Sequence, residues 1–123
     1  MQFLTDRKRA QGLGAGGTGT QHHWQMLVSS ILMIAAVPLF IFTFGYGLGG
    51  SFEEVQAYFS RPLPAIIMGL SLIVITRHVM QETHEAIEDY VHGAAGKLLI
   101  VAVSAFAYTL IAAGLFALVK LAL

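Results

Sequence analysis

Three long apolar segments, separated by short polar stretches, dominate the pattern of the chain. No charged residue occurs between Arg9 and Glu53, and residues 26–48 form the first apolar segment within this interval. The second and third segments cover residues 63–84 and 98–119. Each approaches or exceeds the ~20 residues that a helix needs to cross a bilayer. The pattern therefore predicts an all-α integral membrane protein with three transmembrane helices, preceded by an N-terminal segment.

Glycine and proline mark where these helices are expected to be interrupted. Residues 12–20 are rich in glycine and threonine, which predicts an irregular segment rather than a helix. Pro38 lies inside the first span and predicts a kink there. Residues 52–64 carry charges and are expected to form a short connection in water. Gly93 and Gly96 are expected to break the chain before the third span.

The second span must extend beyond its uncharged part, which ends at Thr76. That part is too short to cross a bilayer, so the helix is expected to continue through Arg77 and His78 to about Thr83. At ~1.5 Å per residue, Tyr90 would lie ~18 Å further along the helix than His78. His78 is then inside the membrane, and Tyr90 is at or just outside its boundary.

Composition supports a membrane protein and removes several other classes. Hydrophobic residues make up 56% of the 123 residues and charged residues only 11%, whereas a soluble domain carries roughly 25% charged residues. The formal net charge is zero, so no basic surface indicates nucleic-acid binding. The chain has no cysteine, which excludes disulfides, thiolate zinc sites and cysteine-ligated iron–sulfur clusters. Any redox centre must use histidine or come from a partner.

The distribution of basic residues predicts the orientation. Most of them precede the first span or flank the turn between the second and third spans: Arg7, Lys8, Arg9, Arg77 and Lys97. The opposite side has only Arg61 and Lys120. The excess of positive charge in cytoplasmic loops then places residues 1–24, and Tyr90 with them, on the cytoplasmic side.

His78 is the principal candidate for chemistry. An ionisable side chain at membrane depth costs several kcal/mol on most scales, which makes it a functional candidate by default. Neutral imidazole is also the common protein ligand of haem iron. Two interpretations remain open: an axial haem ligand whose opposite ligand comes from another subunit, or a hydrogen bond to a backbone carbonyl of a neighbouring helix. Arg77 could pair with a haem propionate or extend to the lipid headgroups.

Acidic residues follow His78 on the same helix face, at Glu82, Glu85 and Asp89. The two glutamates are interpreted as the solvated or partner-facing end of a helix leaving the membrane. Asp89 differs because Tyr90 follows it, and a phenol is a hydrogen-bond donor suited to a quinone carbonyl. The carboxylate could orient this phenol or relay protons. An ordinary interfacial tyrosine would explain Tyr90 alone.

Four other histidines receive weaker assignments. His22 and His23 are adjacent and point in different directions on a helix, so they are expected at the interface rather than at a shared metal. No role follows from the sequence for His84 and His92.

The chain resembles the small hydrophobic membrane anchor of succinate dehydrogenase (respiratory complex II), in its alphaproteobacterial and mitochondrial form. The similarity lies in three spans within 123 residues, a histidine in the second span, and an Asp–Tyr pair that begins eleven positions later. It extends to residues 87–93 and to the N-terminal basic and glycine-rich stretch. The chain departs from relatives that carry arginine early in the first span, where residues 26–30 are uncharged, and just after the haem histidine, where it has Met80.

The resemblance implies a non-catalytic subunit in a two-subunit helical anchor bundle of a bacterial inner membrane. His78 would be the axial ligand of haem b, with Arg77 near a propionate. Tyr90 would hydrogen-bond ubiquinone, with Asp89 beside it. The partners implied are a second cytochrome b anchor subunit, an iron–sulfur subunit and a flavoprotein subunit. The alternatives are a fumarate reductase anchor and a small proton-coupled transporter subunit with a relay through His78, Glu82 and Glu85.

Overall fold

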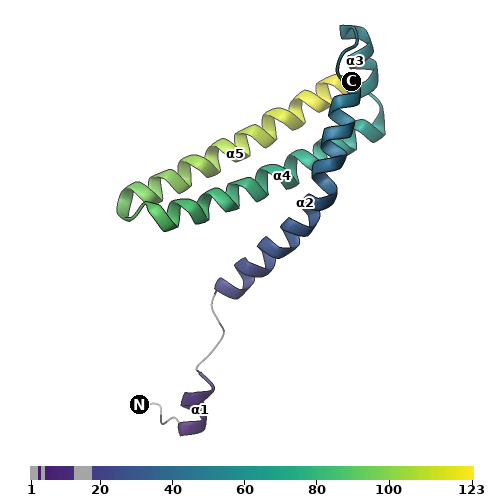
Figure 1. The fold of residues 1–123 in the computed structure, drawn as a ribbon. Coiled ribbons are helices and arrows are strands. Elements are labelled where there is room, and N and C mark those ends of the chain that lie inside the picture. Colours follow the sequence, from purple (N-terminus) through teal and green to yellow (C-terminus); the bar gives the residue numbers. More distant parts are fainter. Residues whose placement is uncertain (1–2, 4, 13–17) are drawn as a thin grey trace.

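The structure is a computed structural model that describes residues 3, 5–12 and 18–123. This part of the chain contains helices and no strand. The helices are α1 (Asp6–Ala10), α2 (Gly19–Gly47), α3 (Phe52–Phe59), α4 (Pro62–Tyr90) and α5 (Gly93–Ala122). By length and composition, α2, α4 and α5 could each cross a membrane. The prediction of an all-α membrane protein with three spanning helices is confirmed (Figure 1).

Helix α4 is the central element of the bundle. It packs against both α2 and α5, whereas α2 and α5 make no contact with each other in the described part of the chain. Figure 1 shows α4 and α5 running side by side in opposite directions, with α2 crossing at the end that carries α3 and the C-terminus. Side chains on α4 can therefore reach either neighbour, which suits a helix that carries the candidate site.

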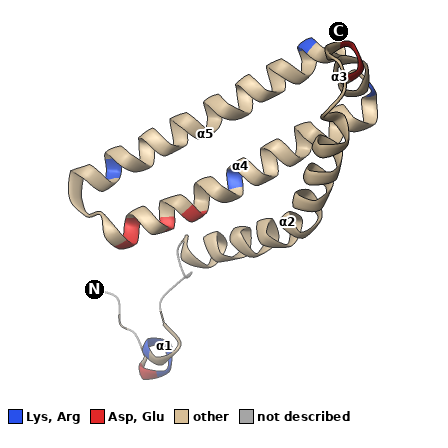
Figure 2. Cartoon of the chain, turned by 45° about the horizontal axis from the view of Figure 1, so that its top comes forward, with Lys and Arg blue, Asp and Glu red and all other residues tan. Residues whose placement is uncertain are grey.

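Charged residues gather at the two ends of the bundle (Figure 2). Lys97 is in the first two turns of α5, which follows the acidic C-terminal part of α4 in the chain, and Lys120 is in the last turn of α5. Arg77 is the one lysine or arginine within α4. Apart from Arg77 and the acidic residues in the C-terminal part of α4, the spanning helices are uncharged between their ends, because charges in hydrocarbon are costly.

Helix α2 begins earlier than the sequence indicated. Gly19 and Thr20 are already helical, and the His22 amide donates to the Thr18 carbonyl at 2.9 Å. The expectation of an irregular segment over residues 12–20 is therefore wrong at its C-terminal end, and residues 13–17 lie outside the described residues. Pro38 lies inside α2, where it removes one backbone donor. The helix bends along its length, in accordance with the predicted kink (Figure 2).

The connection between α2 and α4 contains a helix that the sequence analysis missed. Ser51 and Glu54 form a capping box, in which the Glu54 amide donates to Ser51 Oγ at 3.3 Å and the Ser51 amide donates to Glu54 Oε2 at 2.7 Å. The Tyr58 hydroxyl donates to the Thr43 carbonyl at 2.9 Å and ties α3 to α2. A side chain at Gly47 would collide with the Phe59 ring, so a glycine is required at this contact.

The turn between α4 and α5 is two residues long. Tyr90 ends α4, Val91 and His92 are extended, and α5 begins at Gly93. Gly93 has a φ of 74°, which favours glycine. A Cβ at Gly96 would collide with the Val91 carbonyl oxygen. The two glycines form the first turn of α5 and allow a close turn beside Tyr90, rather than breaking the chain as expected.

Large apolar side chains remain exposed along the spanning helices. Phe106 and Phe116 on α5 are each 70% exposed, and Ile34 and Phe42 on α2 are 75% and 74% exposed. The buried hydrophobic residues within the described ranges are few: Phe59, Met68, Met80 and Ala107. Apolar surface on this scale needs lipid or a partner helix to cover it.

Candidate functional site

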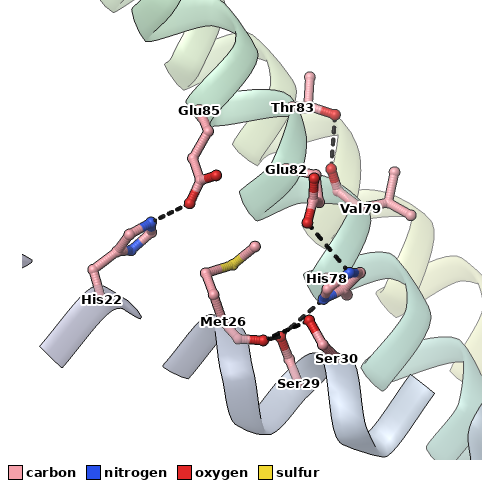
Figure 3. A network of polar contacts seen from close by, with 9 residues as sticks. All are labelled: His22, Met26, Ser29, Ser30, His78, Val79, Glu82, Thr83 and Glu85. Carbon is pink, nitrogen blue, oxygen red and sulfur yellow. Dashed lines mark hydrogen bonds and ion pairs between the residues drawn. The ribbon is translucent and has the colours of Figure 1, made fainter. Parts of the chain in front are cut away.

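The imidazole of His78 lies between α4 and α2, and its side chain is 14% exposed. Nδ1 lies 2.8 Å from Ser29 Oγ on α2, and Nε2 lies 3.5 Å from Glu82 Oε1, one turn along α4 (Figure 3). The partner on the neighbouring helix is a side-chain hydroxyl, rather than the backbone carbonyl considered from the sequence. Both ring nitrogens therefore have a polar neighbour.

Ser29 is the residue of this site that sequence reasoning missed. Its hydroxyl donates to the Met26 carbonyl at 3.0 Å and also faces His78. The neighbouring Ser30 donates to the same carbonyl at 2.8 Å but is exposed (Figure 3). The polar Ser29–Ser30 pair inside an apolar span was the available signal. Serines in helices often bond locally to the backbone, so the pair alone did not indicate a contact with His78.

A second contact joins α2 and α4 nearer to the N-terminal end of α2, the end that is predicted to face the cytoplasm. His22 Nε2 lies 2.8 Å from Glu85 Oε1, with both side chains about half exposed (47% and 46%). Figure 3 shows this contact beside the one between His78 and Glu82. The two glutamates, interpreted from the sequence as a solvated helix end, thus each contact a histidine. The first turn of α2 is held against α4.

Arg77 lies on the neighbouring face of α4 and is exposed. It lines a groove of about 470 Å³ between α2 and α4. The groove has a polar and aromatic part, formed with Arg77 by Gln21, Trp24, Gln25 and Gln81, and an apolar part that includes Val28 and Leu32. Ser29, whose hydroxyl lies 2.8 Å from His78 Nδ1, also lines it. The groove can accept an anionic group beside the haem-ligand candidate.

Asp89 and Tyr90 occupy the last two positions of α4 and are exposed, Tyr90 to 84%. No hydrogen bond joins them to each other or to His78 within the described residues. They lie ~18 Å from His78 along the helix. The two candidate sites are therefore separated along the axis of α4.

His84, which had no role from the sequence, links α4 to α5. Its Nε2 lies 3.0 Å from Ser104 Oγ, and Ser104 also donates to the Ile100 carbonyl at 2.8 Å. Polar pairs of this kind hold membrane helices together with an average of about 0.6 kcal/mol. His84 is thus explained by packing.

Comparison with known proteins decides the family. Residues 3–117 match the family described as succinate dehydrogenase/fumarate reductase transmembrane subunit. The chain belongs to this family. It is also 40% identical over 123 residues to the succinate dehydrogenase hydrophobic membrane anchor subunit of Paracoccus denitrificans, a match that covers 100% of this chain and 95% of that protein. No solved structure matches the chain.

Membership of the succinate dehydrogenase/fumarate reductase family confirms the predicted resemblance and makes the chain a membrane anchor, a non-catalytic subunit of a larger enzyme. Within the described residues, no group of three or more histidine and acidic side chains could hold a metal ion. The anchor can thus contribute single donor atoms such as His78 Nε2, but the described residues do not form a metal site alone.

Proposed function

We propose that this anchor subunit supplies one axial ligand, Nε2 of His78, to a b-type haem that it shares with a second cytochrome b anchor subunit. The observation that carries the proposal is the placement of the ring, mostly buried in the α2–α4 interface, with Nδ1 2.8 Å from a hydroxyl. Metal-ligating histidines almost always hydrogen-bond through their other ring nitrogen, which fixes the ring orientation. Among the polar contacts of the described residues, Nε2 has Glu82 as its neighbour, and the Glu82 side chain is 58% exposed and can turn aside.

The donor chemistry around His78 fits a haem whose second ligand comes from outside this chain. His78 offers one nitrogen, and a six-coordinate haem needs two axial ligands. When bound, the haem would supply a one-electron redox centre within the membrane. Arg77, one residue away and exposed in the groove, is placed to pair with a propionate, because guanidinium groups bind carboxylates strongly.

The quinone part of the proposal rests on Tyr90 and Asp89 at the end of α4. The exposed Tyr90 hydroxyl can donate a hydrogen bond to a ubiquinone carbonyl. Asp89 is next to it at the C-terminal end of the helix, where the helix dipole disfavours a negative charge and the last turn has no basic residue. A carboxylate at this position does not stabilise the helix. A role in orienting the Tyr90 phenol or in passing protons to the quinone would account for its presence.

The orientation and partners complete the proposal. The excess of basic residues supports an orientation in which the N-terminus and Tyr90 would face the cytoplasm across a bacterial inner membrane. There the anchor would tether an iron–sulfur subunit and a flavoprotein subunit, and electrons from succinate would reach quinone at Tyr90. The exposed apolar faces of α2 and α5 are available to lipid and to the second anchor subunit.

A fumarate reductase anchor is the nearest alternative, because the matching family includes both enzymes. The two functions differ in the direction of electron flow, not in the ligand chemistry of His78. Membership of this family favours either anchor over the proton-coupled transporter subunit that the charged residues also allowed.

Affinity purification of the tagged chain in mild detergent tests the proposal. We expect three further subunits to co-purify: a flavoprotein, an iron–sulfur protein and a second hydrophobic anchor. The reduced-minus-oxidised spectrum should show b-type haem in proportion to the tagged chain. Co-purification of the soluble subunits without any haem would contradict the haem part of the proposal. Purification without the soluble subunits would contradict the tethering part.

A further inference from the structure

The hydroxyl of Ser29 lies between the His78 ring and the backbone of its own helix. It is 2.8 Å from His78 Nδ1 and 3.0 Å from the Met26 carbonyl oxygen (Figure 3). We propose that Ser29 is a positioning residue for the haem ligand: it accepts a hydrogen bond from Nδ1–H of His78 and thereby directs Nε2 to the iron. The inference rests on the proposed function of His78.

The contacts of the Ser29 hydroxyl favour one direction for its hydrogen bond with His78. A serine hydroxyl has one proton, and a carbonyl oxygen can only accept. When Ser29 gives its proton to the Met26 carbonyl, a lone pair of Oγ remains for Nδ1. Iron binding requires an unprotonated Nε2, so a neutral ring then carries its proton on Nδ1. Every donor and acceptor in the series from His78 through Ser29 to Met26 is then satisfied.

The consequence for the iron follows from the basicity of the ligand. A hydrogen bond from Nδ1–H raises the electron-donating power of imidazole and fixes the plane of its ring. A stronger donor favours the ferric over the ferrous state. Loss of the acceptor should therefore raise the haem midpoint potential and weaken haem retention, by about 10- to 100-fold if Ser29 acts like other outer-shell partners.

Ser30 provides a matched control on the adjacent position of α2. It has the same side chain and donates to the same Met26 carbonyl, at 2.8 Å, yet it is exposed and, within the described residues, makes no hydrogen bond to His78. A general effect of removing a serine from this turn should appear equally in both alanine variants. Only a contact with the ligand should distinguish Ser29.

The experiment compares the wild-type complex with its Ser29→Ala, Ser30→Ala and Ser29→Thr variants, each purified as the full assembly. Two quantities are measured: the midpoint potential of the b haem by redox titration, and the rate of haem transfer to apomyoglobin. We expect Ser29→Ala alone to show a higher potential and a transfer rate raised about 10- to 100-fold. Ser29→Thr keeps the hydroxyl and should match wild type.

Equal potentials and transfer rates in Ser29→Ala and Ser30→Ala would overturn the inference, as would Ser29→Thr behaving like Ser29→Ala. If Ser29→Ala does not assemble, Ser29→Cys replaces it, because a thiol has a similar size but is only a weak acceptor. Absence of b haem from the wild-type complex would instead contradict the proposed function. The two failures are therefore distinguishable.

Discussion

His22 and Glu85 are 63 positions apart in the sequence, yet His22 Nε2 lies 2.8 Å from Glu85 Oε1. This contact holds the first turn of α2 against α4, a little more than one turn before Asp89 and Tyr90. The N-terminal end of α2 and the quinone candidate therefore belong to the same end of the bundle.

Replacing His22 by alanine should loosen this attachment with a modest loss of stability. Because both side chains are about half exposed (47% and 46%), solvent screens the contact, and we expect a loss of at most about 1 kcal/mol. Limited proteolysis after Arg7, Lys8 or Arg9 should become faster in the purified complex. His23→Ala is the control, because His23 is exposed and adjacent. Equal proteolysis in the two variants would remove the role assigned to the contact.

Gly96→Ala should disturb the turn beside Tyr90. The added methyl group would meet the Val91 carbonyl oxygen, a backbone atom that cannot rotate aside. Overpacking of this kind costs typically about 1–3 kcal/mol, and we expect a lower thermal midpoint together with slower quinone reduction. Gly45→Ala is the control, since nothing lies within 4 Å of a Cβ at that position. A Gly96→Ala complex as stable and active as Gly45→Ala would show that the turn tolerates a side chain.

Tyr90→Phe should slow quinone reduction selectively, because it removes the hydroxyl and keeps the ring. Loss of a hydrogen bond that strengthens in the transition state should cost on the order of 1–3 kcal/mol, or ~5- to 150-fold in rate. The measurement compares succinate:quinone with succinate:dye activity in matched membranes, and haem content should not change. Tyr46→Phe is the control, because Tyr46 is 83% exposed, like Tyr90 at 84%, but lies near the end of α2 at the opposite end of the bundle. Wild-type rates with both acceptors would leave Tyr90 as an interfacial anchor.

The termini should lie on opposite sides of the membrane, with the N-terminus in the cytoplasm. Three spanning helices require opposite sides, and the basic residues set the direction. An alkaline phosphatase reporter fused after Leu123 should be active, since this enzyme works in the periplasm. An inactive phosphatase fusion, with an active cytoplasmic reporter at the same position, would contradict the predicted orientation. Tyr90 would then lie on the side opposite to cytoplasmic electron donors.

The sequence was sufficient to predict the spanning helices and to single out His78 as a candidate, because both follow from the cost of placing polar groups in hydrocarbon. Long apolar runs have few alternatives to membrane helices, and an ionisable residue within one requires an explanation. Helix α3 could also have been found, since Ser51 and Glu54 have the spacing of a capping box. The charged residues between α2 and α4 were instead interpreted as a loop, and the capping-box spacing was overlooked.

The contacts between helices could not be predicted in the same way. Ser29 with His78, and His22 with Glu85, join residues 49 and 63 positions apart. Such pairs depend on how α2 rotates and tilts against α4, and helix periodicity contains no information about this. The start of α2 at Gly19 was likewise hidden, because glycine and threonine have low helix propensity and the attachment of His22 to α4 is a tertiary contact.

The haem spectrum of a His78→Ala complex tests the central claim most directly, with His84→Ala as the matched control. Both histidines lie on α4 and both contact a serine hydroxyl on a neighbouring helix, His78 with Ser29 and His84 with Ser104. Only His78 is assigned to haem iron. The reduced-minus-oxidised spectrum should lose its b-type absorption in His78→Ala and keep it in His84→Ala, while dye-linked succinate oxidation survives in both. An unchanged b-type spectrum in assembled His78→Ala complex would contradict the assignment of His78 as the haem ligand.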